Sequence, residues 1–290
     1  MRFARSSAQS PVPGCDREDP GPRPATLPRW MRRIGSGIGF SAFGLGALVL
    51  WFFAFPLIRL SVRDPVRRRR RTRALIERSF RAFIGLLVGI GSIRVRYRNA
   101  ERLEGPGPLL IVANHPTLID VCLLVSRVPD AECVVKRDVW SNPFMRGVVR
   151  AADYIPNDGG EGLVETCVER LRAGRTLILF PEGSRSPKGG LRSFKRGAAR
   201  IALQADCPVM LVDITCRPPF LGKEDSWYQV PRSLPCYTVT AHAPARVPQM
   251  EDSTADGLEV DDVAESSNAS QARRLTRDWR RGFEERLGHG

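Results

Sequence analysis

The 290-residue chain has few of the side chains that build metal centres and disulfide frameworks. It contains only three histidines, and its seven cysteines are odd in number and include no CxxC pair. Several of these cysteines stand in apolar runs, where cysteine behaves as a small hydrophobic residue. The pattern argues against a zinc site or a disulfide scaffold and favours a reducing compartment. We therefore expect no metal and no cofactor.

The chain also lacks internal repeats, a GxSxG nucleophile elbow, and any helix-turn-helix, zinc-finger or RNA-binding signature. Acidic residues are few: 31 stand against 45 lysines and arginines, which gives a net charge of +14. Such a charge predicts an anionic partner. Because the excess is mostly arginine beside an apolar segment, we expect a membrane surface and no nucleic acid.

The N-terminal third of the chain predicts a membrane anchor. Residues 1–33 are rich in Pro, Gly, Ser and Arg, and we expect them to form a disordered lead. Residues 34–58 carry no charge; they are long enough to cross a hydrocarbon core of about 30 Å, and also suit a helix lying in one leaflet. A second, amphipathic helix is expected at 74–90, so that residues 34–92 form a helical pair.

An arginine run, Arg67–Arg71, lies between the two expected helices. Lysines and arginines that flank a membrane helix are retained on the cytoplasmic side of the membrane. We therefore expect the domain that follows the arginine run to lie on the cytoplasmic face. The arginines would then meet anionic headgroups. A solvated linker is the alternative interpretation of the same run.

Residues 93–242 alternate between strand and helix patterns, which predicts an α/β domain with a mostly parallel sheet flanked by helices. From residue 243 to 290 we expect an acidic linker, as far as about residue 270, and then a C-terminal helix. Its row of Leu275, Trp279, Phe283 and Leu287 should pack on the domain or on the membrane. The expected strands are 93–97, 109–113, 132–135, 176–180, 208–214 and 236–241, and the expected helices of the domain are 116–127, 161–173 and 194–205.

The first stretch that could contribute catalytic side chains is LLIVANHPTLID at residues 109–120. An apolar strand ends at His115, and Pro116 suits the first turn of a helix. The positive end of that helix would favour a neutral imidazole, which can accept a proton. Asp120 is the nearest acid in sequence; turned towards the ring, it would set the tautomer and stabilise the imidazolium that forms. A purely structural His–Asp pair is the plainer alternative.

The second stretch is TLILFPEGSRS at residues 176–186, another buried strand that ends in polar residues. Glu182, Ser184 and Arg185 follow this strand, and Gly183 allows a sharp turn. Because the carboxyl ends of parallel strands open onto one crevice, where ligands bind, the two stretches predict a single site.

These motifs resemble those of the glycerolipid (lysophospholipid) acyltransferases, which include the 1-acylglycerol-3-phosphate acyltransferases. Residues 114–120 are similar to the family's HxxxxD signature, and residues 180–186 to its FPEGTRS motif, with Ser184 in place of threonine. Residues 136–156, which begin with Lys-Arg, are similar to a second motif, and residues 207–212 to the last one. The resemblance covers about residues 109–214, in the family's order.

The resemblance implies a membrane-associated O-acyltransferase of phospholipid biosynthesis. His115, paired with Asp120, would take the proton of a lysophospholipid hydroxyl as it attacks an acyl thioester, either acyl-CoA or an acidic acyl-carrier protein. In the family the glutamate and arginine of the FPEGTRS motif are associated with acceptor binding, and Arg185 offers a planar fork for a phosphate. The expected acceptor-binding residues are Glu182, Gly183, Ser184, Arg185, Lys136 and Arg137. Lys188, Arg192 and Lys195 would serve the anionic head of the donor or form a solvated basic loop.

Other functions fit parts of the pattern. The same chemistry on a different lipid acceptor, such as an amino-acid lipid or a glycolipid, would need only a changed acceptor site. A membrane adaptor that binds anionic lipid without turnover would not need His115 and Asp120. We assign no role to His242 or His289, and expect Trp227-Tyr228 to belong to the core.

Overall fold

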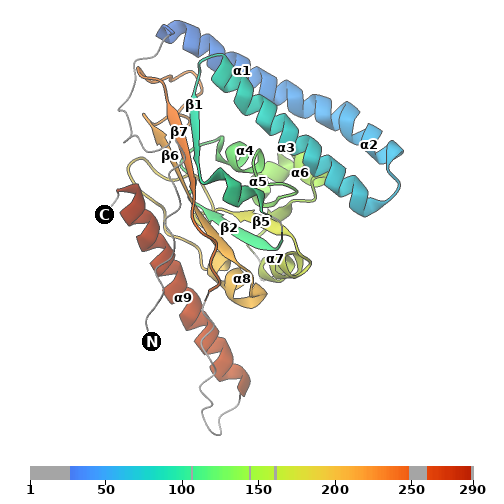
Figure 1. Cartoon of the computed structure of the whole chain (residues 1–290), viewed down its shortest axis with the longest axis vertical. Coiled ribbons are helices and arrows are strands. Elements are labelled where there is room, and N and C mark those ends of the chain that lie inside the picture. Colours follow the sequence, from blue (N-terminus) through green and yellow to red (C-terminus); the bar gives the residue numbers. More distant parts are fainter. Residues whose placement is uncertain (1–26, 106, 144, 160–161, 248–259, 289–290) are drawn as a thin grey trace, which may run out of the picture.

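The computed structural model describes residues 27–105, 107–143, 145–159, 162–247 and 260–288. Most of the expected N-terminal lead and the linker residues 248–259 lie outside these ranges. The centre of the molecule is a seven-stranded sheet in the order β1-β7-β6-β2-β5-β3-β4 (Figure 1). All its pairs are parallel except β6–β7, which confirms the mostly parallel sheet.

The sheet's strands alternate along the chain with helices that cover both faces. The strands are β1 (Arg94–Arg98), β2 (Leu109–Ala113), β3 (Glu132–Lys136), β4 (Ile155–Asn157), β5 (Thr176–Leu179), β6 (Val209–Arg217) and β7 (Cys236–Ala241). The domain's helices are α4 (Asp120–Val125), α5 (Arg137–Ser141), α6 (Arg146–Ala151), α7 (Gly162–Arg172) and α8 (Gly197–Ala205). The sequence missed β4, α5 and α6, because elements of three to six residues are too short to show a periodicity.

Strand β2 shows why the sheet is buried on both faces. All five of its residues are buried. Ile111 and Ala113 belong to one apolar cluster, whereas Leu110 and Val112 belong to another, because successive side chains of a strand point to opposite faces. The first cluster includes residues of α3 and α4, and the second includes residues of α7, α8 and α9.

The N-terminal segment forms a helical hairpin along one side of the domain (Figure 1). Helix α1 (Arg29–Val49) continues through a π-helical turn at Leu50–Ala54 into α2 (Phe55–Ser61). By length and composition, this run of 33 residues could cross a membrane. Only 17 % of the residues in its most apolar stretch are buried against the rest of the protein. It begins at Arg29, directly after Pro28, so the expected boundary at residue 34 was five residues too late.

Helix α3 (Pro65–Gly89) is the second arm of the hairpin and also begins earlier than expected. The carboxylate of Asp64 caps its start by accepting a hydrogen bond from the Arg67 amide at 2.9 Å. The arginine run at 67–71 therefore lies in the first turns of a helix, and the alternative interpretation of a linker is wrong.

Helix α3 is attached to the domain through a buried ionic cluster. Arg73 is 2 % exposed and its Nη2 lies 2.8 Å from Oε1 of Glu132, which is fully buried in β3. Arg170 and Arg175 lie 3.5 and 3.8 Å from the same carboxylate. Arg73 also donates to the Ala152 carbonyl at 2.9 Å. The hairpin thus has a defined position on the domain.

The C-terminal helix α9 (Val260–Leu287) begins eleven residues earlier than the sequence suggested. Residues 260–270 were expected to be linker; no Gly or Pro interrupts them, so the helix that packs on the domain continues through them. Phe283 and Leu287 are 0 % and 5 % exposed and belong to the cluster that contains α8 residues. Their row packs on the domain, which was one of the two expected surfaces.

Candidate active site

The loop between β2 and α4 holds a histidine–aspartate pair. His115 Nδ1 lies 2.8 Å from Asp120 Oδ2, and the Asp120 side chain is fully buried. Thr117 donates to the same carboxylate, from its amide at 2.7 Å and from its hydroxyl. The carboxylate is therefore held in place by several donors, and it sets which imidazole nitrogen faces away from it.

The structure corrects one step of the sequence argument for His115. Helix α4 begins at Asp120, not at Pro116, because Thr117 and Asp120 hold the intervening residues in a turn. The histidine is therefore not at a helix start, and its tautomer depends on Asp120. Within the described ranges no group hydrogen-bonds Nε2 of His115, so this nitrogen is available to a substrate.

A phenylalanine orients the imidazole from one side. The rings of His115 and Phe180 are stacked, with centroids 4.4 Å apart and an interplanar angle of 29°. Phe180 immediately follows β5, so the two strand ends β2 and β5, which are neighbours in the sheet, bring these rings together. We did not predict this role, although the position of Phe180 at the end of a strand and before Pro-Glu-Gly was visible in the sequence.

Glu182 joins the two motif loops. Its carboxylate is 4 % exposed and accepts hydrogen bonds from the His115 amide at 2.9 Å, the Ser186 hydroxyl at 2.8 Å and the Arg192 amide at 2.9 Å. The Ser186 amide donates in return to the His115 carbonyl at 2.7 Å. Glu182 thus positions the histidine backbone, whereas the Arg185 guanidinium donates to backbone carbonyls and not to this carboxylate.

Replacing Glu182 by alanine is expected to lower the free energy of unfolding by about 2–4 kcal/mol, since it leaves three buried or half-buried donors without an acceptor. Chemical denaturation of the purified protein measures this loss. The exposed neighbour Glu224 is the matched control, and Glu224→Ala should change the stability little. Equal effects of the two substitutions would show that Glu182 does not join the loops.

The side chain of Arg185, which follows β5 in the same loop as Glu182, binds the segment between β6 and β7. Its Nη1 donates to the carbonyls of Gly222 at 2.7 Å and Leu221 at 3.3 Å, in the segment between β6 and β7. Leu118, which follows the His115 loop, donates from its amide to the Leu221 carbonyl at 2.9 Å. The guanidinium is therefore anchored through Nη1, and none of the described residues is hydrogen-bonded to its Nε or Nη2.

The structure separates the two other predicted cations. Lys136 lines the same cavity as His115 and pairs with Asp138. Arg137 does not: its side chain is 77 % exposed, lies 4.0 Å from Asp158 and is not part of the cavity wall. The structure therefore does not bring Arg137 into the cavity wall with the other predicted residues, because α5 begins at this residue and carries it away from the end of β3.

Lys188, Arg192 and Lys195 were expected to bind the anionic head of the acyl donor, and of these three Lys195 lines the cavity. The aliphatic chain of Lys195 lies against Gly183, whose φ of +66° suits glycine. Lys188 instead pairs with Asp225 at 3.0 Å. Arg192 donates from Nε to the Arg185 carbonyl at 3.1 Å and so supports the loop.

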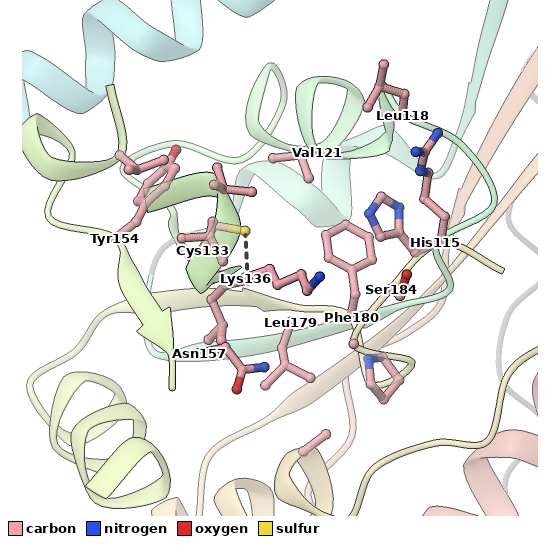
Figure 2. Close-up of a pocket in the computed structure, with 18 of the residues that line it drawn as sticks. His115, Leu118, Val121, Cys133, Lys136, Tyr154, Asn157, Leu179, Phe180 and Ser184 are labelled. Carbon is pink, nitrogen blue, oxygen red and sulfur yellow. Dashed lines mark hydrogen bonds between the residues drawn. The ribbon is translucent and has the colours of Figure 1, made fainter. Parts of the chain in front are cut away.

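A cavity of about 1280 Å³ adjoins His115, with Ser184 and Phe180 beside the ring (Figure 2). Gly183, Ser184, Arg185, Lys136 and Lys195 also line it. Its remaining wall is mostly apolar and includes Phe43, Phe80, Val121, Cys133, Val135, Val139, Val148 and Tyr154. No group of three His, Cys, Asp or Glu side chains among the described residues could hold a metal ion.

The cysteines of this cavity are not suited to nucleophilic catalysis. Burial raises the pKa of the Cys122 and Cys133 thiols to about 12, and the Asp120 charge adds to the shift of Cys122. A thiol with so high a pKa holds its proton near neutral pH, so it lacks the thiolate that would attack. The imidazole of His115 is therefore a better candidate for the reactive group than either thiol.

A second histidine–aspartate pair, His242 and Asp213, links two elements of the fold and lies outside the cavity. His242 Nε2 lies 2.6 Å from Asp213 Oδ2, and Arg286 of α9 binds both oxygens of Asp213 at 2.8 and 3.0 Å. Neither His242 nor Asp213 lines the cavity. This pair attaches α9 to β6, whereas the pair at His115 faces an apolar space.

Comparisons with known proteins agree with this geometry. The family model described as Acyltransferase matches residues 94–215. The chain is 27% identical over 174 residues to the 1-acyl-sn-glycerol-3-phosphate acyltransferase alpha of Mus musculus, which covers 56% of this chain and 61% of that protein. It is 32% identical over 179 residues to the chloroplastic 1-acyl-sn-glycerol-3-phosphate acyltransferase LPAT1 of Arabidopsis thaliana, covering 58% and 46%. The match thus spans less than two thirds of these relatives.

A solved structure extends the likeness to the fold. The crystal structure of PlsC, the 1-acyl-sn-glycerophosphate (LPA) acyltransferase from Thermotoga maritima, superimposes with a TM-score of 0.60 at 21% identity. The similarity covers 85% of this chain and 97% of that one. Sequence motifs, site geometry and fold agree: residues 94–215, which hold the site, match the acyltransferase family.

Proposed function

We propose that this protein transfers a fatty acyl group from an acyl thioester to the free hydroxyl of a lysophospholipid such as 1-acylglycerol-3-phosphate. The observation that carries the proposal is the His115–Asp120 pair, which leaves Nε2 of His115 free beside an apolar cavity. The relatives' names, as 1-acyl-sn-glycerol-3-phosphate acyltransferases, support the choice of acceptor.

The chemistry follows from the free nitrogen. Nε2 of His115 removes the proton from the acceptor hydroxyl as the oxygen attacks the thioester carbon. Asp120 stabilises the imidazolium that forms. When the carbon–sulfur bond breaks, the thiolate leaves and takes the proton back from His115. The transfer is direct and needs neither a covalent enzyme intermediate nor a cofactor.

Negative charge develops on the carbonyl oxygen of the thioester during the attack, and hydrogen-bond donors near His115 would stabilise it. The amides of His115, Thr117 and Leu118 already donate to Glu182, Asp120 and the Leu221 carbonyl. The side chains of Ser184 and Arg185 line the cavity and offer donors on that side. We assign the acceptor phosphate to Nε and Nη2 of Arg185, to which no group in the described part of the chain is hydrogen-bonded.

The apolar part of the cavity suits the acyl chain of the donor, since burying methylene groups there releases water from them. The exposed apolar side of α1 and α2 suits attachment to a membrane, with the catalytic domain on the cytoplasmic face. A membrane adaptor without turnover would not require a free Nε2 beside such a cavity.

The test is an assay of the purified full-length protein in detergent, with a labelled acyl thioester and a panel of lysolipids. We expect a new ester on acceptors that carry a glycerol hydroxyl and a phosphate. Binding of lysolipid without any transfer would contradict the proposed function and favour the adaptor.

Replacing Arg185 by alanine is expected to raise the KM for a phosphate-bearing acceptor by about tenfold to a hundredfold, because a charge-assisted hydrogen bond pair contributes about 1.5–3 kcal/mol. The KM for an uncharged monoacylglycerol acceptor should change much less. Arg185→Lys keeps the charge but not the planar fork and should fall between the two. An equal rise for both acceptors would show that Arg185 does not bind the phosphate.

A further inference from the structure

The segment between β6 and β7, residues 218–235, contacts both the candidate active site and helix α1. All of its residues are described, and none of them belongs to a helix or a strand, so contacts with the rest of the protein fix its path. Near its start, the carbonyls of Leu221 and Gly222 accept hydrogen bonds from Nη1 of Arg185 at 3.3 and 2.7 Å. The Leu221 carbonyl also accepts from the amide of Leu118, in the loop that follows β2, at 2.9 Å. The path of this segment therefore sets the position of the Arg185 guanidinium.

The far end of the segment is bound by a buried arginine of α1, whose start lies beside it (Figure 1). Arg32 is 1 % exposed, and its two terminal nitrogens donate to three consecutive backbone carbonyls. The distances are 2.7 Å from Nη2 to the carbonyls of Pro231 and Arg232, and 3.1 Å from Nη1 to that of Ser233. One side chain thus fixes a whole turn of the segment to α1.

Two other residues of α1 hold the neighbouring backbone. Arg29 donates from Nε to the Val230 carbonyl at 2.9 Å, and the Ser36 hydroxyl donates to the Trp227 carbonyl at 2.6 Å. The side chains of Trp227 and Tyr228 are not what attaches the segment: they are 44 % and 51 % exposed, so the expectation that they belong to the core is wrong. The helix binds the backbone of the segment and thereby fixes its path.

Two consecutive turns connect the part of the segment at α1 with the part at Arg185. The Gly222 carbonyl accepts from the Asp225 amide at 3.3 Å, and the Ser226 carbonyl accepts from the Gln229 amide at 2.9 Å. The side chains of Asp225 and Gln229 accept in return from the amides of Gly222 and Ser226, at 3.0 and 2.9 Å. Because the turns follow each other directly, a displacement at the far end is passed to Gly222.

The charge of Arg32 is not balanced by a described carboxylate. None of the described acidic side chains forms an ion pair with it, and its Nε has no hydrogen-bond partner among the described residues. A buried charge costs free energy, and replacing buried charged groups by apolar side chains of similar volume is often neutral for stability. An apolar side chain cannot, however, replace a planar fork that fixes three carbonyls at once. The contact is therefore suited to placing the segment more than to stabilising the fold.

We propose that Arg32 is a positioning residue for the acceptor site. By fixing the carbonyls at residues 231–233 to α1, it holds the segment so that the carbonyls of Leu221 and Gly222 keep Nη1 of Arg185 in place. Arg32 touches no substrate and acts through Arg185. This role rests on the proposed function, in which Arg185 binds the acceptor phosphate, and it makes α1 a contributor to acceptor binding.

The experiment compares Arg32→Met with Arg33→Met in the full-length protein in detergent. Arg33 is the next residue and is exposed, so its replacement removes the same charge from the same turn of α1. Transfer from a labelled acyl thioester is measured to 1-acylglycerol-3-phosphate and to an uncharged monoacylglycerol. We expect Arg32→Met to raise the KM for the phosphate-bearing acceptor about tenfold, because a small displacement of a binding group has large effects. The KM for monoacylglycerol and kcat should stay within about twofold, and Arg33→Met should change none of these values.

A double variant shows whether Arg32 acts through Arg185. Adding Arg32→Met to Arg185→Ala should raise the KM for 1-acylglycerol-3-phosphate by less than about twofold, because the residue that Arg32 positions is already gone. Arg32→Lys keeps the charge but not the planar fork, so its KM should lie between those of the unmodified protein and of Arg32→Met. Trypsin supplies a readout that is independent of activity: cleavage after Lys223, which is exposed in the segment, should be faster in Arg32→Met than in Arg33→Met.

The outcomes distinguish this proposal from the proposed function. Arg32 does not position Arg185 if its replacement raises the KM for both acceptors equally, if it leaves both unchanged, or if its tenfold effect persists in the Arg185→Ala background. If the unmodified protein transfers no acyl group to any lysolipid, the proposed function itself is wrong. Melting temperatures show whether each variant is folded. If Arg32→Met is unfolded at the assay temperature, Arg32→Lys decides, and an unchanged KM for 1-acylglycerol-3-phosphate in that variant overturns the proposal.

Discussion

Replacing His115 by alanine is expected to lower kcat for acyl transfer by about 10³-fold or more, because general base catalysis contributes about 10²–10⁴-fold and the hydroxyl is a poor nucleophile without it. Asp120→Asn keeps the shape of the side chain but removes the charge that stabilises the imidazolium. We expect a loss of a similar order, since the wrong tautomer then faces the acceptor. The KM values for both substrates should change little, as neither residue is placed to bind them in the ground state.

The measurement is the release of free thiol from an acyl thioester by the purified protein. His242→Ala is the matched control, because His242 also pairs with an aspartate, at 2.6 Å, but does not line the cavity. It should keep transfer within about twofold of the unmodified protein. Unchanged transfer in His115→Ala would overturn the assignment of the base, whereas equal losses at both histidines would indicate a structural role for each.

Replacing Glu132 by alanine is expected to lower the free energy of unfolding by about 3–5 kcal/mol, because it leaves buried arginine charge uncompensated. Glu132 is fully buried, and Arg73, at 2.8 Å, is 2 % exposed. Burial raises the pKa of Glu132, and the neighbouring arginines oppose that rise. The loss should fall mainly on the contact between α3 and the sheet, because Arg73 is the residue of the hairpin that reaches Glu132.

Urea denaturation in detergent measures this loss, and limited proteolysis shows whether the hairpin separates first. Asp278→Ala is the control: Asp278 is 52 % exposed and lies 4.0 and 3.7 Å from two arginines of its own helix, an arrangement worth less than about 1 kcal/mol. If Glu132→Ala costs no more than this surface control, the cluster does not hold the hairpin to the domain.

The sequence by itself determined the two motif loops and the sheet that carries them. The apolar runs Leu109–Ala113 and Leu177–Leu179 predict buried strands, and the polar residues after them had to emerge at one edge of a parallel sheet. The His115–Asp120 pair was also predictable, because the partners are five positions apart and a turn closes over so short a distance. Local spacing and strand direction are properties that a sequence contains.

Contacts between distant residues were decided only in the tertiary structure. Glu182 was expected to bind the acceptor, yet it lies 67 positions from His115 and holds that residue's amide. The stacking of Phe180 on His115, the departure of Arg137 from the site and the burial of Arg73 against Glu132 have the same origin. A buried carboxylate takes the donors that the fold brings to it, and which donors those are depends on how strands and helices pack, which no local pattern records.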